Sequence, residues 1–415
     1  MNNTFDVVIV GGGAAGIAAA RRLSQTDLST LLLEASPRLG GRAWTHEVAG
    51  SNLDLGCGWF HSAERNAWVH IAEAAGFPID RSVAKWGVQY RDLGFPKDQQ
   101  VEARRAFDTW MRELEHAPPP GDCAADALPA GGEWTNYIRA IGGFISGASL
   151  DRLSIADYLA YDEASSENNW RTPAGLGTVV ARGFPQRVPL RLATSVDALT
   201  LSAAGVSLAT TAGTVTARGA ILTVSTAVLA GDALKLPAEL APWREAANQL
   251  PLGRNEKLFF QIVGDAPFAP ESQVLGDPRD ARTGSYYIRP LGSRTIECFF
   301  GAEGARMIEE SGPVAGFDFA LGQLAALFGT DIRAALRPLA ASAWSGSKLI
   351  GGAYSYALPG HAAARQTLAQ PYDARVFFAG EATSAGDFST AHGAHDSGVR
   401  AAEEAIASFA LRSGR

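Results

Sequence analysis

The sequence begins with a short apolar run that leads into a glycine-rich turn and then into strong helix formers. Residues 5–10 read Phe-Asp-Val-Val-Ile-Val, residues 11–16 read Gly-Gly-Gly-Ala-Ala-Gly, and residues 18–23 are mostly small or aliphatic. This order predicts a strand, a tight turn and a helix, which together start a βαβ unit.

The turn matches the pattern G-x-G-x-x-G. Gly11 allows the tight turn, Gly13 lets the backbone approach a pyrophosphate, and Gly16 lets the helix pack closely on the strand. Ala14 and Ala15 complete the turn, and the unpaired N–H groups of the helix amino terminus face the diphosphate. The pattern predicts a dinucleotide site.

A second apolar run, residues 30–33, ends in Glu34-Ala35. Glu34 lies 23 residues beyond Gly11, where a carboxylate at the tip of the second strand accepts hydrogen bonds from a ribose 2′-hydroxyl. The same charge repels a 2′-phosphate, so NADP is disfavoured while NAD and FAD both stay open. The next turn, Gly40-Gly41-Arg42, offers a guanidinium for phosphate.

Composition excludes several other classes of protein. The 415 residues carry a formal net charge of −7, which disfavours nucleic acid as a partner. The three cysteines are far apart, so neither a disulfide framework nor a zinc site is indicated. No apolar run approaches the roughly 20 residues of a membrane span, and no secretion signal is evident. We expect a cytoplasmic protein that has no membrane anchor.

The combined motifs resemble the amino terminus of the flavin-containing amine oxidase family, which includes monoamine and polyamine oxidases. Three further stretches match this family in order and spacing. They are residues 54–61 (Asp-Leu-Gly-Cys-Gly-Trp-Phe-His), residues 196–257, and residues 344–394, the last with Gly351-Gly352-Ala353-Tyr354, Phe378-Ala379-Gly380-Glu381 and Thr390-Ala391-His392-Gly393-Ala394.

The resemblance implies FAD as the cofactor and adds residues to its site. The additions are Gly56, Gly58, Trp59, Val196, Gly380, Glu381, Thr390 and Ala391, beside Gly41 and Arg42. Glu381 follows a predicted strand, and its family counterpart accepts hydrogen bonds from ribityl hydroxyls. Covalent members carry a cysteine where this chain has Ala353, so non-covalent FAD is expected.

A helix is predicted from about residue 391 to residue 409, with Ser389 and Thr390 as good amino-terminal caps. Its positive end would face the flavin N1 and C2 carbonyl, where negative charge collects on reduction. His392, His395 and Asp396 lie close together on it. No third ligand of suitable type accompanies the histidines, so we expect no metal.

The resemblance also indicates five residues for the reaction. Tyr354 matches one wall of the family's aromatic cage, and the opposite wall falls at Thr390, which leaves the cage half-open. Trp344 either lies near the flavin or packs in the core. Lys257 matches a lysine that holds a water near flavin N5 and assists the reaction with oxygen, and it is one of only five lysines. His61 reaches the substrate side or has a structural role.

The expected fold is α/β: a Rossmann-like FAD-binding domain with a discontinuous α+β substrate domain, a sheet covered by helices. We assign residues 1–75, 185–245 and 345–415 to the FAD-binding domain and residues 76–184 and 246–344 to the substrate domain. Within the latter, residues 285–288 and 295–300 predict strands and residues 317–327 a helix. The acidic stretch 157–167 is typical of a solvated surface.

These features favour an FAD-dependent amine oxidase that takes a small-molecule amine and O2 and releases an imine and hydrogen peroxide. Two alternatives stay open. One is an L-amino-acid oxidase, which needs an arginine aimed at the substrate carboxylate, and the other is an accessory flavin-binding protein without turnover. The substrate's identity, the electron acceptor and the oligomeric state are not fixed by the sequence.

Overall fold

The structure is a computed structural model that describes residues 3–264 and 267–413. Its first sheet has seven strands. β5 (Leu190–Arg191), β2 (Thr30–Leu33), β1 (Thr4–Val10), β8 (Gly213–Leu222), β7 (Gly205–Thr210) and β6 (Val196–Ser202) follow one another across it, and β14 (Val376–Phe378) also pairs with β8. The strands β5, β2, β1, β8 and β14 run parallel, while β6 and β7 form an antiparallel extension.

This sheet is buried on both faces, as expected for parallel strands. Residues 7–10 of β1 and residues 31–33 of β2 are each at most 5% exposed. Helix α1 (Ala14–Leu23) packs against α12 (Ala391–Ser413), and both lie along the sheet. A β-carbon at Gly398 would approach the Ala15 carbonyl oxygen to 2.1 Å, so this close helix pair depends on glycine at position 398.

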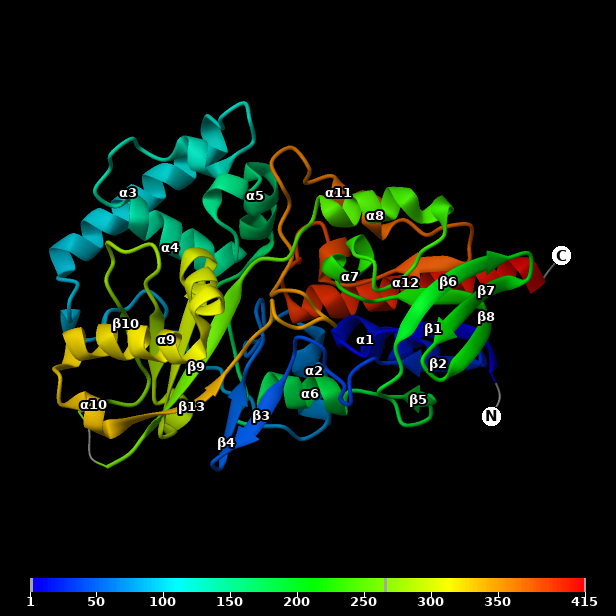
Figure 1. Cartoon of the computed structure of the whole chain (residues 1–415), viewed down its shortest axis with the longest axis horizontal. Helices are drawn as coiled ribbons and strands as arrows, with labels where there is room; N and C mark the ends of the chain where they lie inside the picture. Colours follow the sequence, from blue (N-terminus) through cyan, green and yellow to red (C-terminus); the bar gives the residue numbers. More distant parts are fainter. Residues whose placement is uncertain (1–2, 265–266, 414–415) are drawn as a thin grey trace.

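The second sheet is antiparallel and lies in the other lobe of the molecule (Figure 1). Its order is β10 (Ser272–Leu275), β11 (Ser285–Ile288), β12 (Thr295–Gly301), β9 (Asn255–Ile262) and β13 (Leu336–Ala341). Helix α9 (Ala302–Phe328) covers one face. The helix predicted over residues 317–327 is therefore longer, and it is interrupted at Gly312, where φ is +82°.

Helices surround both sheets. In chain order the remaining elements are β3 (Thr45–Val48), β4 (Ser51–Asp54), α2 (Ala67–Ala74), α3 (Lys97–His116), α4 (Thr135–Ser146), α5 (Ile155–Ala164), α6 (Leu176–Arg182), α7 (Thr226–Ala230), α8 (Ala241–Asn248), α10 (Ile332–Ala335) and α11 (Ala364–Ala369). α6 shares a core with α1 and α2 on the nucleotide side. The domain boundaries stay a prediction, and this packing favours a boundary before residue 176.

The acidic stretch 157–167 is only partly solvated, because Asp157 is 1% exposed. Its carboxylate forms a two-point ion pair with Arg365, with Nε–Oδ1 and Nη2–Oδ2 distances of 2.6 and 2.8 Å. Asp157 lies on α5 and Arg365 on α11. The expectation of a solvated surface is wrong at this residue, because a guanidinium from a distant segment neutralises the buried charge.

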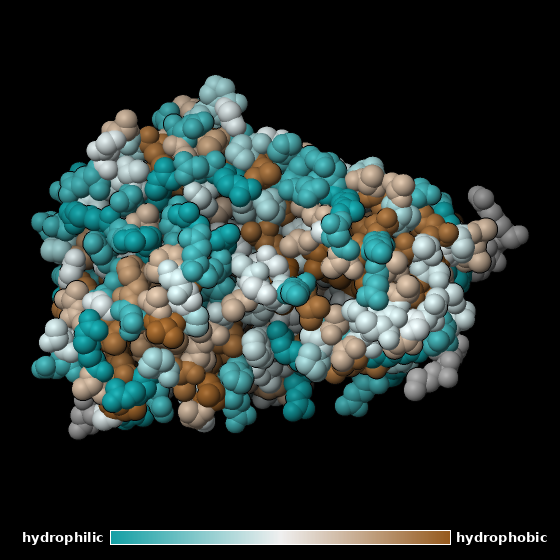
Figure 2. Space-filling view, in the orientation of Figure 1, coloured by the Kyte–Doolittle hydropathy of each residue, from teal (hydrophilic) through white to brown (hydrophobic). Residues whose placement is uncertain are grey.

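Most of the outer surface visible in Figure 2 is hydrophilic or mixed, and apolar side chains lie in the recess where the two lobes meet. None of the helices in the described ranges combines the length and the apolar character that a membrane span requires.

We predict that Asp157→Ala lowers the free energy of unfolding by about 3–5 kcal/mol, because it leaves the Arg365 guanidinium buried without its counter-charge. Asp151→Ala is the matched control. Asp151 pairs with Arg139 at 2.6 Å, and the Asp151 side chain is 58% exposed. Its removal should lower the free energy of unfolding by less than about 1 kcal/mol. Urea unfolding of both variants measures the difference, and equal losses would contradict a structural role for the buried pair.

Candidate functional site

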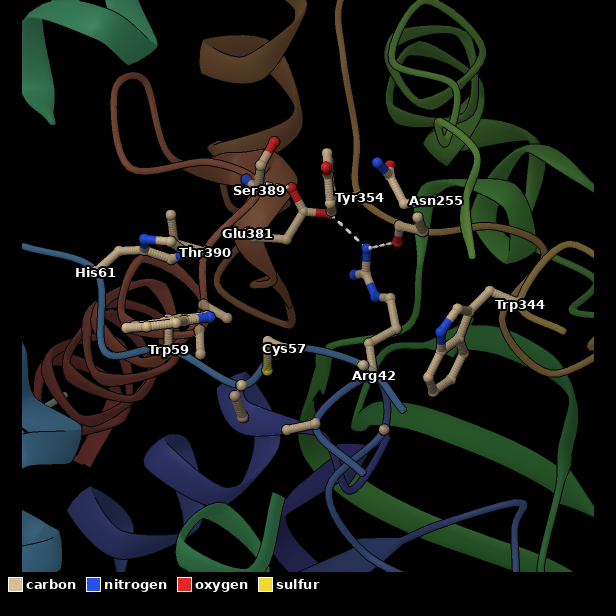
Figure 3. A pocket seen from close by; sticks show the side chains of 18 of the residues that line it. Arg42, Cys57, Trp59, His61, Asn255, Trp344, Tyr354, Glu381, Ser389 and Thr390 are labelled. Carbon is tan, nitrogen blue, oxygen red and sulfur yellow. Dashed lines mark hydrogen bonds and ion pairs between the residues drawn. The ribbon is translucent and has the colours of Figure 1, made fainter. Parts of the chain in front are cut away.

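A cavity of about 1120 Å³ is lined by residues from the glycine turn after β1 as well as by residues of the antiparallel sheet. It is larger than the roughly 300–1,000 Å³ of an ordinary ligand pocket, so it has room for a large cofactor and a second molecule. Its walls come from both ends of the chain and from the middle. Figure 3 shows part of it, with Arg42 near the centre and Trp59 and Trp344 on opposite sides.

Sequence-predicted site residues gather around this one cavity. Those that line it are Gly11, Gly13, Ala14, Ala15, Glu34, Ala35, Gly41, Arg42, Gly56, Gly58, Trp59, His61, Val196, Lys257, Trp344, Tyr354, Gly380, Glu381, Thr390 and Ala391. Gly16 does not line it: a β-carbon there would lie 1.9 Å from the Gly11 carbonyl oxygen. Gly16 therefore acts by close packing of the helix on the turn, and not by contact with a ligand.

The nucleotide end has the geometry that the motif predicts. Glu34 follows β2, and its Oε2 accepts a hydrogen bond from the Gly12 N–H at 2.5 Å while Oε1 accepts one from the Ser36 N–H at 2.7 Å. The carboxylate is thus fixed at the cavity wall, beside the amino terminus of α1. A carboxylate held there suits a ribose and repels a 2′-phosphate.

Two glycines leave open space that fits a bound cofactor. A β-carbon at Gly13 would meet its nearest non-neighbouring atom at 3.9 Å, and one at Gly380 would meet no described atom within 4 Å. Both residues line the cavity. Neither protein packing nor backbone conformation explains glycine at position 13, whereas a diphosphate against the backbone does. At Gly380 the φ of +136° already favours glycine.

The amino terminus of α12 also faces the cavity, as predicted. Thr390 caps it, because its Oγ1 accepts a hydrogen bond from the Gly393 N–H at 3.0 Å. Ser389 does not cap this helix, and that expectation is wrong. Its hydroxyl donates to the Ser355 carbonyl at 3.1 Å and its N–H donates to Glu381, so it ties the turn to a neighbouring segment.

Glu381 is 5% exposed, and protein donors occupy its carboxylate. Oε1 accepts hydrogen bonds from Arg42 at 2.8 Å and from the Ser355 N–H, and Oε2 accepts them from the Ser355 hydroxyl and the Ser389 N–H. Burial alone would raise the pKa of Glu381, but Arg42 and Arg365 lower it overall, so the group is ionised. Its visible role is to hold Arg42 at the cavity wall (Figure 3).

Lys257 is the cation at the sheet end of the cavity. Its ammonium donates to the Asp54 carbonyl at 3.1 Å and pairs with the Glu297 carboxylate at 2.7 Å. The two side chains are 10% and 18% exposed. Lys257 is therefore a fixed, partly desolvated donor and not a solvated strand end.

Aromatic residues predicted for the reaction differ in their roles. Trp344 is 7% exposed, donates its indole N–H to the Leu55 carbonyl at 2.9 Å and lies edge-on to Trp44, so it packs the wall. Tyr354 reaches the cavity, and its hydroxyl donates to the Phe144 carbonyl at 2.7 Å. The position of the Tyr354 ring is thus fixed by a hydrogen bond to α4.

Two titratable groups in the wall are uncharged near neutral pH. Burial lowers the pKa of His61 to about 4, although its ring contacts the Asn169 amide oxygen at 2.6 Å, so the imidazole is neutral. Burial and the Asp54 carboxylate raise the pKa of the Cys57 thiol to about 12, which keeps it protonated. Cys57 is therefore an unreactive wall residue.

His392 contacts Asp387 at 3.1 Å, and His395 contacts Asp396 at 2.8 Å. Within the described ranges no group of three metal-ligating side chains of the His, Cys, Asp or Glu type comes together.

The sequence interpretation missed four residues that line the cavity near Lys257 and Tyr354. Trp86, Tyr287, Glu297 and Phe299 line it. The last three alternate with the core residues Tyr286, Cys298 and Phe300 along β11 and β12, so they share the sheet face that Lys257 occupies. This period of two is visible in the sequence, but which face meets a cavity depends on tertiary packing.

Comparison with known proteins agrees with this geometry. The family model described as flavin containing amine oxidoreductase matches residues 14–91 and 85–406. Polyamine oxidase 2 of Arabidopsis thaliana is 26% identical over 437 residues, which cover 96% of this chain and 87% of the plant protein. Pseudooxynicotine dehydrogenase of a Pseudomonas species is 42% identical over 82 residues, which cover 20% of this chain and 16% of the bacterial dehydrogenase. A solved structure of putrescine oxidase bound to putrescine is 18% identical, has a TM-score of 0.78, and covers 98% of this chain and 100% of its own.

We predict that Gly13→Val abolishes tight FAD binding, because its side chain enters the open space beside the helix terminus. Gly13 has φ −80° and ψ −173°, a conformation open to any residue, so the apoprotein should fold. We expect at least an about 100-fold rise in the FAD dissociation constant, equivalent to about 2.7 kcal/mol, in fluorescence titration of the apoprotein.

The control is Gly322→Ala on α9, where a β-carbon meets no described atom within 4 Å and no cavity lies. It should bind FAD like the parent protein. The Gly13→Val apoprotein should keep the melting temperature of the parent apoprotein. If its FAD dissociation constant then lies within about threefold of the parent value, the cofactor does not approach this turn.

Proposed function

The chain belongs to the family of flavin-containing amine oxidoreductases, and we propose that it uses O2 to oxidise a small-molecule amine to an imine, with release of hydrogen peroxide. The family makes it an FAD-dependent oxidoreductase that acts on amines. The acceptor, the products and the residue roles below are the proposal. The observation that carries it is the buried Lys257–Glu297 pair in the wall of the same cavity that has the nucleotide-binding turn at its other end.

FAD, when bound in this cavity, would supply the acceptor for a hydride equivalent from the carbon next to the amine nitrogen. The chain's own residues supply the surroundings. Arg42, held by Glu381 and by the Ala353 carbonyl at 2.6 Å, stands at the cavity wall, and the amino terminus of α12 adds partial positive charge. Aromatic side chains line this part of the cavity and reduce the contact of the reacting end with water.

The roles of Tyr354 and Lys257 follow from their positions. Tyr354 limits one side of the space, and Thr390, occupied as a helix cap, leaves the other side wider. Lys257 holds a positive charge at the wall, where it stabilises the negative charge that develops as dioxygen accepts electrons. Glu297 and the Asp54 carbonyl keep the ammonium in that place.

An L-amino-acid oxidase is supported less well. Of the arginines that line the cavity, Arg42 is committed to Glu381 and the Ala353 carbonyl, and Arg38 donates to the Leu39 and Gly41 carbonyls near the nucleotide end. Arg104 lies on α3 and is exposed. Within the described residues, the cavity wall therefore offers a substrate α-carboxylate only the exposed guanidinium of Arg104.

We further propose non-covalent FAD and a cytoplasmic location. Ala353 stands at the position that is cysteine in covalent relatives, and the thiol of Cys57 is held protonated. All three cysteines are unpaired, which fits a reducing compartment. Release of FAD by acid precipitation, with a colourless pellet, tests the first proposal.

The proposed reaction predicts that excess amine bleaches the oxidised flavin spectrum without oxygen, and that air restores it with one peroxide per flavin. The neutral amine reacts, so kcat/KM should rise with pH up to the pKa of the substrate. His61 titrates near pH 4 and should not shape this limb, so His61→Gln keeps the profile above pH 5.5. If the flavin stays oxidised and yellow with aliphatic amines, aromatic amines and polyamines in the absence of oxygen, the proposed reaction is wrong.

We predict that Lys257→Met slows flavin reoxidation by O2 at least about tenfold, a barrier change of about 1.4 kcal/mol, and changes anaerobic reduction less than about threefold. Lys257→Arg retains the cation and should recover most of the rate. Lys348→Met is the control, since Lys348 lines the cavity but is exposed. Stopped-flow absorbance measures both half-reactions. An equal loss in both of them for Lys257→Met would point to general damage of the site.

A further inference from the structure

We infer that the substrate end of the cavity takes an amine with an aromatic or bulky apolar body and no second positive charge, in preference to a linear polyamine. This inference rests on the proposed amine oxidation and names its substrate class. It depends on a fixed aromatic wall and on the pairing of the carboxylates that reach this end of the cavity.

The wall is formed by the rings of Trp59, Trp86 and Tyr287, all of which line the cavity. Trp59 stacks on Tyr287 with ring centroids 6.1 Å apart and an interplanar angle of 26°, and Trp86 meets Trp59 edge-on at 4.8 Å. Three rings in such contact present a wide apolar surface to a ligand.

Arg171 fixes this wall from behind. It is 7% exposed, and its guanidinium lies 5.2 Å from the Trp59 ring centroid and 5.1 Å from that of Tyr287. Nη2 pairs with Asp80 at 2.8 Å and with Glu271 at 2.6 Å, and Tyr287 donates its hydroxyl to Glu271. Because the rings are held before a ligand arrives, binding costs little ordering of side chains.

Further aromatic side chains line the cavity, and Phe299 lies on the same sheet face as Tyr287. Phe144 and Phe299 line the cavity with ring centroids 5.8 Å apart, and Tyr354 is anchored to the Phe144 carbonyl. Thr390 is a small residue in the cavity wall, where it takes up less room than an aromatic side chain would. The size of the space and its lining favour a ring over a thin polymethylene chain.

The buried carboxylates near the reacting end are already neutralised. Glu297 pairs with Lys257, Glu381 with Arg42, and Asp387 with Arg65 at 2.5 Å and with His392. These three carboxylates already have a counter-charge, so a second ammonium placed beside them would have to compete with the cations that they bind.

Two other acidic residues line this half of the cavity, Asp162 and Glu167, and both are exposed. An ion pair with a solvated carboxylate contributes little to binding. Arg104, an exposed cation that also lines the cavity, opposes a second positive charge. The charges thus give a polyamine no strong anchor, whereas the ring wall gives one to an apolar body.

The test uses two ligands that share a four-carbon alcohol and cannot be oxidised as amines: 4-phenylbutan-1-ol and 4-(trimethylammonio)butan-1-ol. Isothermal titration calorimetry on the oxidised, FAD-loaded protein gives both dissociation constants. We expect the phenyl ligand to bind at least about 30-fold more tightly, the effect of burying one ring. Equal or tighter binding of the cationic ligand overturns the inference.

Variants locate the binding surface. Trp86 is 43% exposed, so Trp86→Ala should fold, and we expect it to weaken the phenyl ligand about tenfold while Trp86→Phe retains most of the affinity. Glu167→Gln is the matched control and should change neither ligand more than about twofold. A loss of affinity for the cationic ligand in Glu167→Gln or Asp162→Asn, with Trp86→Ala unchanged, would assign the site to polyamines.

Anaerobic reduction separates this inference from the proposed function. If 4-phenylbutylamine bleaches the flavin and 1,4-diaminobutane does so far less efficiently, both stand. If only 1,4-diaminobutane bleaches it, amine oxidation stands and the substrate class is wrong. If neither bleaches it while the phenyl alcohol still binds more tightly, the apolar preference stands and the proposed reaction fails.

Discussion

A buried chain of alternating charges joins segments that are far apart in the sequence. Arg42 pairs with Glu381, Glu381 accepts from the Ser355 hydroxyl, and Arg365 connects that hydroxyl to Asp157. Each buried charge is tolerable only because its neighbour opposes it. The chain fixes the turn after β2, the end of β14, α11 and α5 relative to one another, and it thereby holds Arg42 and Glu381 in the cavity wall.

Local sequence signals were sufficient for the nucleotide end. Strand, turn and helix follow in sequence, and Gly13 and Glu34 act through backbone geometry that a short motif already defines. The cap at Thr390 was predictable for the same reason, whereas Ser389 instead bonds to Ser355, a partner 34 residues away. The local sequence predicts a helix cap correctly only where no distant group forms a hydrogen bond with the same side chain.

The substrate half could not be obtained in this way. Trp59 was assigned to the cofactor through a family motif, yet its ring stacks on Tyr287, more than 200 residues later in the sequence. Glu297 became visible only as the partner of Lys257, across two paired strands. In the sequence, Asp157 is one of several acidic residues typical of a surface, and only the fold brings Arg365 beside it. Each of these roles depends on a contact between distant segments.

The two ends of the cavity depend on different kinds of contact. The cofactor end depends on backbone and a few charges, which leave little freedom for change. The substrate end depends on side chains of a sheet face and of the loops around Trp59 and Trp86, which can change without loss of the fold.

A crystal structure of the FAD-loaded protein with 4-phenylbutylamine, grown without oxygen, tests the central claim most directly. We predict the ribose of FAD beside Glu34, and the phenyl ring of the amine against Trp59, Trp86 and Tyr287 with its nitrogen toward the Lys257 wall. An amine bound at Asp162 and Glu167, with the aromatic wall vacant, would contradict the assignment of this cavity to the oxidation of apolar amines.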